Sequence, residues 1–216
     1  MSDAFSTLIS DTRAFMSELS QNNNRDWFQE NKARYDAQLK KPAKLLLDTI
    51  APALSAELDQ PVTTKLFRAN RDVRFSKDKT PYTLHLHLLW SPQGNGTQPA
   101  YFFGIASDYV TAGAGVMGFD KAQQNDWRKW VSAREGAALQ SKIDAAVKAG
   151  ATVRKPELKR VPSPFEKDHP RADLLRYKSF TLWKDIEQEA LVDLPKALRA
   201  AQSTFEPILD DLRAFL

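Results

Sequence analysis

The stretch TLHLHLLW, residues 83–90, alternates apolar and polar side chains, which indicates a β-strand with one buried face. The side chains expected on the buried face are Leu84, Leu86, Leu88 and Trp90. The stretch AYFFGIAS, residues 100–107, is almost wholly apolar, as is typical of a central strand covered on both faces. Turn-forming residues separate the two stretches, so we predict neighbouring antiparallel strands.

Further strands are predicted on both sides of this pair. TKLFRANRDVRF, residues 64–75, predicts a half-buried strand that places Phe67 and Phe75 on its apolar side, with Arg71 as a basic exception on that side. DYVTAGAGVM, residues 108–117, predicts a fourth strand, whose glycines permit a bulge or the close approach of another backbone. SFTLWKD, residues 179–185, predicts a strand that returns to the sheet.

Helices are predicted before and after these strands, from apolar residues at spacings of three and four. They run from Asp3 to Leu19, from Asp26, from Pro42, through 121–149 with a joint near Gly136, and from Asp193 to Leu216 with a break before Pro207. Helices, then strands, then helices indicate the α+β class. We therefore predict one domain over residues 1–216, an antiparallel sheet of about four to six strands packed with N-terminal and C-terminal helices.

The composition excludes several classes of protein. With 216 residues, of which 42% are hydrophobic, the chain is long enough to form a core and does not resemble a disordered protein. It has no cysteine, which excludes disulfides, thiolate chemistry and most structural zinc sites. No signal-like leader and no apolar run of about 18 residues is present, so we predict a cytoplasmic protein without a membrane partner.

The positive charge is concentrated in two segments. Lys65 to Lys79 holds six Lys or Arg and two Asp, and Arg154 to Lys178 holds eight Lys or Arg and four acids, so that each segment has a net charge of +4. Because the whole chain is also +4, the remaining residues together carry a net negative charge. A local excess of positive charge is informative about the binding partners of a protein and not about its fold.

The stretch RDVRFSKDKTPY, residues 71–82, is the strongest candidate site. Guanidinium and ammonium groups that converge can bind a phosphate or carboxylate. The alternative is a solvated loop with internal ion pairs such as Arg74 with Asp72. The predicted ligand-binding residues of the chain are Asn23, Arg68, Arg71, Arg74, Lys77, Lys79, Tyr82, Lys159 and Arg160.

Candidates for catalysis and for metal binding are few. Asp72, Asp168 and His169 are the candidates for proton transfer, although the DHP of residues 168–170 is equally suited to a turn. His85 and His87 share a strand face, but a metal needs a third ligand, and we favour two solvent-facing histidines and no metal site. No nucleotide-binding or hydrolase motif is present, and the pattern specifies neither a cofactor nor whether the chain is an enzyme.

Four motifs in order resemble the uncharacterised family known as domain of unknown function 2461. They are NNNRDWFQENKARYD at 22–36, FRANRDVRFSKDKTPY at 67–82, the glycine segment at 113–115 and LKRVPSPFEKDHP at 158–170. The resemblance covers nearly the whole chain, implies a single α+β domain, and supplies no catalytic residue. Four separated motifs in one fold suggest one shared site. We expect the residues that converge there to be Asn23, Arg71, Arg74, Lys77, Lys79 and Tyr82 with Lys159, Arg160 and His169.

Together these features predict a basic pocket for an anionic, phosphorylated small molecule, with catalysis left open. The alternatives are a nucleic-acid-binding module, since the pI is about 9.2 and aromatic residues lie near basic ones, and a structural or protein-interaction domain whose charged motif is an internal salt-bridge network. We rank nucleic acid second among the binding hypotheses, because most of the aromatic residues fall in apolar runs. The sequence specifies neither the identity of the ligand nor the oligomeric state.

Overall fold

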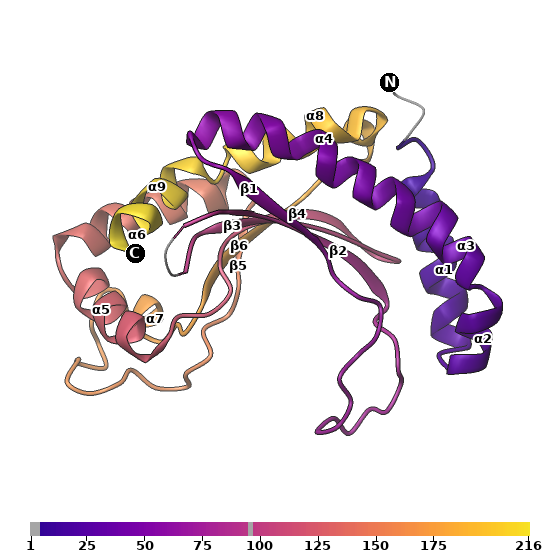
Figure 1. The fold of residues 1–216 in the computed structure, drawn as a ribbon. Helices are drawn as coiled ribbons and strands as arrows, with labels where there is room; N and C mark the ends of the chain where they lie inside the picture. Colours follow the sequence, from indigo (N-terminus) through magenta and orange to yellow (C-terminus); the bar gives the residue numbers. More distant parts are fainter. Residues whose placement is uncertain (1–4, 95–96) are drawn as a thin grey trace. The chain divides into compact units, whose positions relative to one another are not determined.

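The computed structural model describes residues 5–94 and 97–216. Figure 1 shows helices packed on a sheet whose six strands run in the order β1-β2-β3-β4-β6-β5. The sheet is antiparallel, which confirms the predicted α+β class. The strands are β1 (Val62–Leu66), β2 (His85–Pro92), β3 (Ala100–Ala106), β4 (Val110–Val116), β5 (Thr152–Val153) and β6 (Phe180–Asp185).

The strands predicted at 83–90, 100–107, 108–117 and 179–185 are confirmed as β2, β3, β4 and β6, within two residues at each end. β2 alternates half-buried and buried side chains, and both β3 and β4 are buried along their whole length. Of the side chains predicted on the buried face of β2, Leu84 is 40% exposed because it precedes the strand.

The predicted strand over residues 64–75 is wrong beyond Leu66, where β1 ends. After Leu66 the chain keeps one hydrogen bond to β2, from the Phe67 backbone N–H to the His87 carbonyl, and then leaves the sheet. The alternation of apolar and charged residues continues beyond that point, but the backbone there pairs only through an isolated bridge between Asn70 and Tyr82. An extended pattern without a ladder of hydrogen bonds does not make a strand.

The chain divides into two compact units. The first comprises Met1–Pro92, Phe102–Ala112 and Asp185–Arg199, and the second comprises Gln93–Tyr101, Gly113–Lys184 and Ala200–Leu216. The single domain predicted over residues 1–216 stays a prediction, and each unit is described by itself below.

The first unit packs its helices on β1 and β2. They are α1 (Leu8–Gln21), α2 (Arg25–Glu30) and one continuous run of α3 (Lys32–Arg34), a π-helical stretch (Tyr35–Lys40) and α4 (Lys41–Leu58). Asp3, predicted to begin the first helix, lies outside the described residues. The Trp90 indole N–H donates to the Leu47 carbonyl at 3.0 Å, which ties β2 to α4. Two helices were predicted where the chain forms one run, because Pro42 in the first turn of α4 leaves the preceding turns intact.

The second unit contains α5 (Lys121–Ser132), α6 (Arg134–Lys148), α7 (Ala172–Leu175) and α9 (Glu206–Phe215). α8 (Leu194–Ser203) crosses the boundary between the units, after a 3₁₀ turn at Gln188–Asp193. The predicted break before Pro207 is confirmed by the gap between α8 and α9. The joint between α5 and α6 lies at Ala133 and not near Gly136, which stands in the first turn of α6.

Two glycines of the second unit are required by close packing. A Cβ on Gly136 would lie 1.9 Å from the Val131 carbonyl oxygen at the end of α5. Gly115 in β4 has φ of +131°, and a Cβ there would lie 2.1 Å from the Phe180 carbonyl oxygen of β6. The predicted close approach of another backbone is therefore confirmed at Gly115.

Candidate functional site

The first basic motif forms a long loop between β1 and β2, here called the charged arm (residues 70–82; Figure 1). Its base is closed by a single β-bridge between Asn70 and Tyr82. The Arg71 backbone N–H donates to the Pro81 carbonyl at 2.8 Å, and the Thr83 N–H donates to the Ala69 carbonyl at 2.8 Å. These bonds join the two sides of the loop at its base. They therefore fix the position at which the arm begins.

Asn23, at the turn between α1 and α2, clamps the base of the arm. Its side-chain amide donates to the Tyr82 carbonyl at 3.0 Å and its carbonyl oxygen accepts from the Tyr82 backbone N–H at 3.1 Å. The Tyr82 ring is 3% exposed and stacks on Phe28, with the ring centroids 4.0 Å apart. Asn23 and Tyr82, two of the predicted ligand-binding residues, therefore connect the base of the arm to the turn between α1 and α2.

Most of the charges within the arm are paired with one another. Arg71 binds Asp78 at 2.5 Å and also donates to the Thr80 carbonyl and hydroxyl oxygens. Arg74 binds Asp72 at 2.7 Å, and the Lys79 ammonium donates to the Val73 carbonyl at 3.1 Å. Arg71 is the basic exception on the predicted apolar side, and these intramolecular partners satisfy its charge.

The arm's two carboxylates are held in their charged form. The Thr80 backbone N–H, then Arg71 and the Thr80 hydroxyl, lower the pKa of Asp78 to about 2. Hydrogen bonds from Arg74, and to a smaller extent the charge of Arg68, lower the pKa of Asp72. A lowered pKa makes Asp72 a weaker base than an ordinary carboxylate, which counts against it as a proton acceptor near neutral pH.

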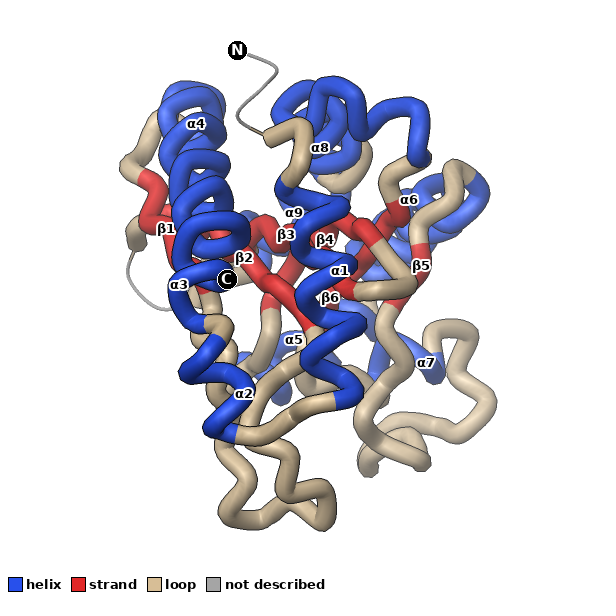
Figure 2. Tube along the Cα trace, turned by 90° about the vertical axis from the view of Figure 1, so that its right-hand side faces the viewer, coloured by secondary structure: helices blue, strands red, loops and turns tan. Residues whose placement is uncertain are grey.

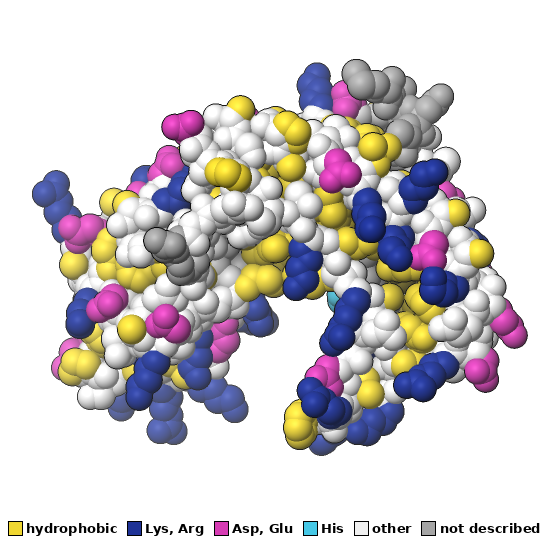
Figure 3. Space-filling view, in the orientation of Figure 1, with side chains coloured by type: hydrophobic (Ala, Val, Ile, Leu, Met, Phe, Trp, Pro, Cys, Tyr) yellow, Lys and Arg dark blue, Asp and Glu magenta, His cyan; other side chains and the backbone are white. Residues whose placement is uncertain are grey.

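The tip of the arm carries an exposed aromatic side chain. Phe75 was predicted on the buried side of a strand, but it is 96% exposed in the turn that follows Val73. The Arg74 guanidinium lies 5.9 Å from the centre of its ring. Figure 3 shows Lys and Arg side chains gathered over this loop, with hydrophobic atoms at its end. The arm therefore offers a ring face flanked by cations.

His85 and His87 stack on each other on the face of β2 that points away from α4, with their ring centroids 3.8 Å apart. His87 Nε2 lies 2.9 Å from the Tyr109 hydroxyl. Burial, together with the neighbouring His85, lowers the pKa of His87 to about 4, and burial lowers that of His85. Both rings are half-buried, so the prediction of solvent-facing histidines holds only in part. Among the described residues, no group of three or more His, Asp or Glu is placed to hold a metal ion.

The second basic segment, Arg154 to Lys178, follows a different path, mostly as loop (Figure 2). Glu157 anchors it to the start of β6 by accepting the Lys178 backbone N–H at 2.8 Å and the Ser179 hydroxyl. Burial alone would raise the pKa of Glu157, but these hydrogen bonds outweigh it and the pKa is lowered. The Tyr177 hydroxyl donates to the Arg154 carbonyl at 2.6 Å, and burial raises the pKa of Tyr177 to about 12.

Arg171 ties the same segment to the end of α5. Its guanidinium donates to the backbone carbonyls of Val131 at 2.5 Å, Ser132 at 2.8 Å and Ala133 at 3.1 Å. The carbonyls at the end of a helix lack partners within the helix, so a cation there satisfies them and interacts favourably with the helix dipole. The loop is thus held by neutral acceptors and one carboxylate.

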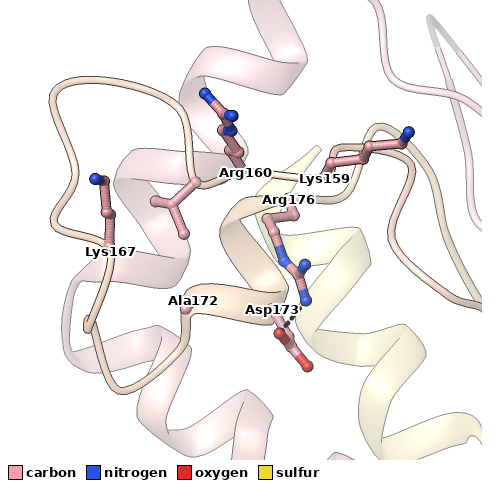
Figure 4. A pocket seen from close by; sticks show the side chains of 7 residues that line it. Lys159, Arg160, Lys167, Ala172, Asp173 and Arg176 are labelled. Atoms are coloured by element: carbon pink, nitrogen blue, oxygen red, sulfur yellow. Dashed lines mark hydrogen bonds and ion pairs between the residues drawn. The ribbon is translucent and has the colours of Figure 1, made fainter.

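Between these anchors lies a pocket of about 600 Å³, here called the basic pocket. Its lining residues are Lys159, Arg160, Val161, Lys167, Ala172, Asp173 and Arg176. Arg176 turns toward Asp173, the only carboxylate of this lining, and pairs with it (Figure 4). Arg160 and Lys167 extend in the same general direction, whereas Lys159 extends to the other side (Figure 4). In the part of the chain that the structure describes, no acid pairs with Lys159, Arg160 or Lys167.

Asp168 and His169 form a turn rather than an acid-oriented histidine. The His169 N–H donates to the Glu166 carbonyl, and the His169 carbonyl accepts the Ala172 N–H at 2.8 Å. His169 Nδ1 accepts the Arg171 backbone N–H at 3.0 Å, so the neutral ring carries its proton on Nε2, from which it can donate.

The predicted site residues thus fall into two groups. Asn23, Tyr82 and the cations of the arm belong to the first unit, and Lys159, Arg160 and His169 belong to the second, so their convergence stays a prediction. Lys159 and Arg160 are brought together with Lys167 and Arg176, two residues that sequence reasoning counted in the charge of the segment but did not single out.

The antiparallel sheet and the helices before and after its strands place the chain in the α+β class. A family model described as conserved hypothetical protein, DUF2461, matches residues 11–210, and the chain belongs to this family. No curated protein matches the chain. Within the described residues, no helix combines the length and hydropathy needed to cross a membrane.

Proposed function

We propose that this is a cytoplasmic protein whose basic pocket binds an anionic, phosphorylated small molecule. The observation that carries the proposal is the excess of unpaired cations. Lys159, Arg160 and Lys167 line a pocket whose single carboxylate, on Asp173, pairs with Arg176. Exposed cations otherwise tend to be balanced by neighbouring acids, so an unbalanced group around a cavity favours an anion from solution.

The side-chain chemistry and the size of the pocket fit such a ligand. A guanidinium such as that of Arg160 can donate two parallel hydrogen bonds to one phosphate, and an ammonium such as that of Lys167 adds a mobile positive charge. A volume of about 600 Å³ lies within the range of small-molecule sites. Val161 and Ala172 supply apolar contact for the uncharged part of such a ligand.

If the pocket also catalyses a reaction, these cations would stabilise developing negative charge, as in phosphoryl transfer. His169 can donate from Nε2 and belongs to the same unit, which makes it the strongest of the three proton-transfer candidates. The proposal itself is one of binding, and activity assays follow only once a ligand is known.

A thermal-shift screen tests the proposal. The full chain is melted with phosphate, nucleotides, sugar phosphates, acyl anions and short oligonucleotides. At 100 times Kd a ligand stabilises the folded state by about 2.7 kcal/mol, which is readily measured. We expect a phosphorylated small molecule to raise the melting temperature, and we expect Arg160→Gln to remove the increase while Arg154→Gln, an exposed cation outside the pocket, retains it. A screen in which no anion stabilises the protein would overturn the proposal.

The exposed ring of Phe75 favours nucleic acid as a second candidate function. An unstacked base can stack on an aromatic face for about 1–3 kcal/mol while nearby cations contact the phosphates. Phe75 with Arg74 and the unpaired Lys77 supplies both elements. Binding to single strands would weaken steeply with salt because counterions are released. A shallow salt dependence, or an affinity unchanged in Phe75→Ala, would dismiss this candidate.

The paired charges of the arm support the third reading, a structural network of salt bridges. Arg71 with Asp78 and Arg74 with Asp72 are the pairs that such a network requires. This reading expects Arg74→Ala to lower the melting temperature and no anion to raise it.

A further inference from the structure

A second cavity, of about 310 Å³, lies in the first unit between the α3–α4 run and the residues that follow β1. We call it the lysine pocket, because three of the residues that line it are Lys32, Lys40 and Lys44. Arg68, from the chain just after β1, adds a fourth cation, and Asp36 is the only acid in the lining. Figure 3 shows a row of Lys and Arg side chains over this helical run, with an acidic one among them.

The Asp36 carboxylate forms ion pairs with two of these lysines. Lys32 Nζ lies 2.5 Å from Asp36 and Lys40 Nζ lies 3.2 Å from it, and hydrogen bonds from both lower the pKa of Asp36. Among the described residues, Lys44 and Arg68 form no ion pair or hydrogen bond. Four cations and one carboxylate line this cavity, so the lining itself has a net positive charge.

The π-helical stretch keeps these residues on one face of the helical run. Residues 32, 36, 40 and 44 are spaced by four, and in an α-helix of 3.6 residues per turn each such step drifts by about 40° around the axis. The stretch Tyr35–Lys40 is a π-helix, which holds more residues per turn and so turns back part of that drift. Single π-helical turns inside helices occur frequently at functional sites.

The inner wall of the cavity is formed by large apolar side chains. Leu66 and Phe67 line it and are half-buried, and behind them lie Phe28 and Tyr35, which are 6% and 8% exposed. The Lys65 ammonium lies 4.8 Å from the centre of the Phe67 ring. A ring or alkyl group could rest on Leu66 and Phe67 while an attached anion meets the cations at the rim.

We propose that the lysine pocket binds a small anion that carries an aromatic or apolar group, held by Lys44 and Arg68 at the anion and by Leu66 and Phe67 at the apolar group. This site is separate from the basic pocket in its residues and in the ligand that it selects. It does not rest on the function proposed above.

Phenyl phosphate tests the inference, because it joins one ring to one dianion, with inorganic phosphate and phenol as its two halves. Binding to the full chain is measured by calorimetry. We expect phenyl phosphate to bind about tenfold more tightly than inorganic phosphate, since partial burial of the ring contributes about 1.4 kcal/mol or more. Equal affinities for the two phosphates would overturn the inference, as would the absence of any binding.

Variants locate the binding. Lys44→Gln combined with Arg68→Gln is expected to weaken phenyl phosphate binding at least about tenfold, because each charged hydrogen bond contributes about 1.5–3 kcal/mol. The matched control is Lys41→Gln with Arg25→Gln, two exposed cations of the same unit that do not line the pocket, and it is expected to bind within about twofold of the wild type. All four side chains are exposed, so the variants should fold, which circular dichroism checks.

The outcome also distinguishes the two pockets. If binding survives Lys44→Gln with Arg68→Gln but is lost in Lys159→Gln with Arg160→Gln, phenyl phosphate occupies the basic pocket. That result would overturn this inference and leave the proposed function standing. Loss of binding only in the first pair supports the lysine pocket, whatever the basic pocket binds.

Discussion

The two basic segments carry the same net charge of +4 but differ in how their cations are paired. In the charged arm, Arg71 and Arg74 pair with aspartates of the arm itself, Lys79 donates to a backbone carbonyl, and Lys77 forms no ion pair or hydrogen bond in the part of the chain that the structure describes. In the second segment, three cations of the pocket have no acidic partner among the described residues, and Arg176 takes the one carboxylate of the lining. Net charge along a segment therefore does not distinguish a site from a self-paired loop, whereas the pairing of the charges does.

The anchors of the two segments differ as well, and this difference gives the largest expected effect. Arg171→Ala should lower the free energy of unfolding by about 2–3 kcal/mol, because the change leaves three carbonyls at the end of α5 without a charged donor. Urea unfolding measures it. Arg154→Ala, which removes the same charge from an exposed position, should change stability by no more than about 0.5 kcal/mol. Equal midpoints for the two variants would contradict the anchoring role.

The clamp of the charged arm should have a smaller effect. Asn23→Ala removes two hydrogen bonds to the Tyr82 backbone, and we expect a loss of about 1–2 kcal/mol in the free energy of unfolding. Gln21→Ala, which removes an exposed amide two residues away, is the control and should be close to neutral. If the two variants unfold at the same urea concentration, the arm is held at its base by other contacts.

The pairing within the arm predicts the titration of Asp78. Its pKa in the folded protein is about 2, against about 3.9 in an unfolded chain. The stabilising contribution is therefore present above the unfolded pKa and is lost as the pH falls through about 2. Arg71→Gln should raise the pKa of Asp78, measured by NMR titration of the carboxyl carbon. Lys77→Gln removes a cation that does not contact Asp78, and the same upward shift in that variant would deny the pair a specific role.

The exposed pair at the arm's tip should have the smallest effect. Arg74 and Asp72 have side chains 77% and 46% exposed, so their coupling should be about 0–1 kcal/mol. A double-mutant cycle with Arg74→Ala and Asp72→Ala measures it. A coupling well above this range would favour a structural network over a loop that is only solvated.

The sequence predicts the sheet well where its period matches real pairing. β2, β3, β4 and β6 were found because alternation or continuous burial reflects neighbours that are present in the fold. The same alternation over residues 67–75 predicted a strand that the chain does not form. It also predicted that Phe75 is buried, whereas this side chain is almost fully exposed. Periodicity indicates which side chains would share a face of an extended chain. Whether that face is buried depends on pairing with another strand and on packing in the folded protein.

The candidate site was predicted only in part. Lys159 and Arg160 stood out from the density of charge, whereas Lys167 and Arg176 join them only through the path of the loop, which four prolines obscure in the sequence. The sequence does contain a pattern that indicates the lysine pocket, namely charged residues spaced by four at positions 32, 36, 40 and 44. That pattern was missed because a spacing of four in an ordinary α-helix drifts off one face, and the π-helical turn that corrects the drift is set by tertiary context.

The central claim is that unpaired cations, not net charge, mark the site, and calorimetry on two double variants tests it most directly. Arg160→Gln with Lys167→Gln removes two unpaired cations of the basic pocket, and Arg71→Gln with Arg74→Gln removes two paired cations of the arm. With the best phosphorylated ligand of the thermal-shift screen, we predict at least about a tenfold loss of affinity in the first variant and less than about a twofold change in the second. Equal losses in both variants, or a larger loss in the second, would contradict the claim.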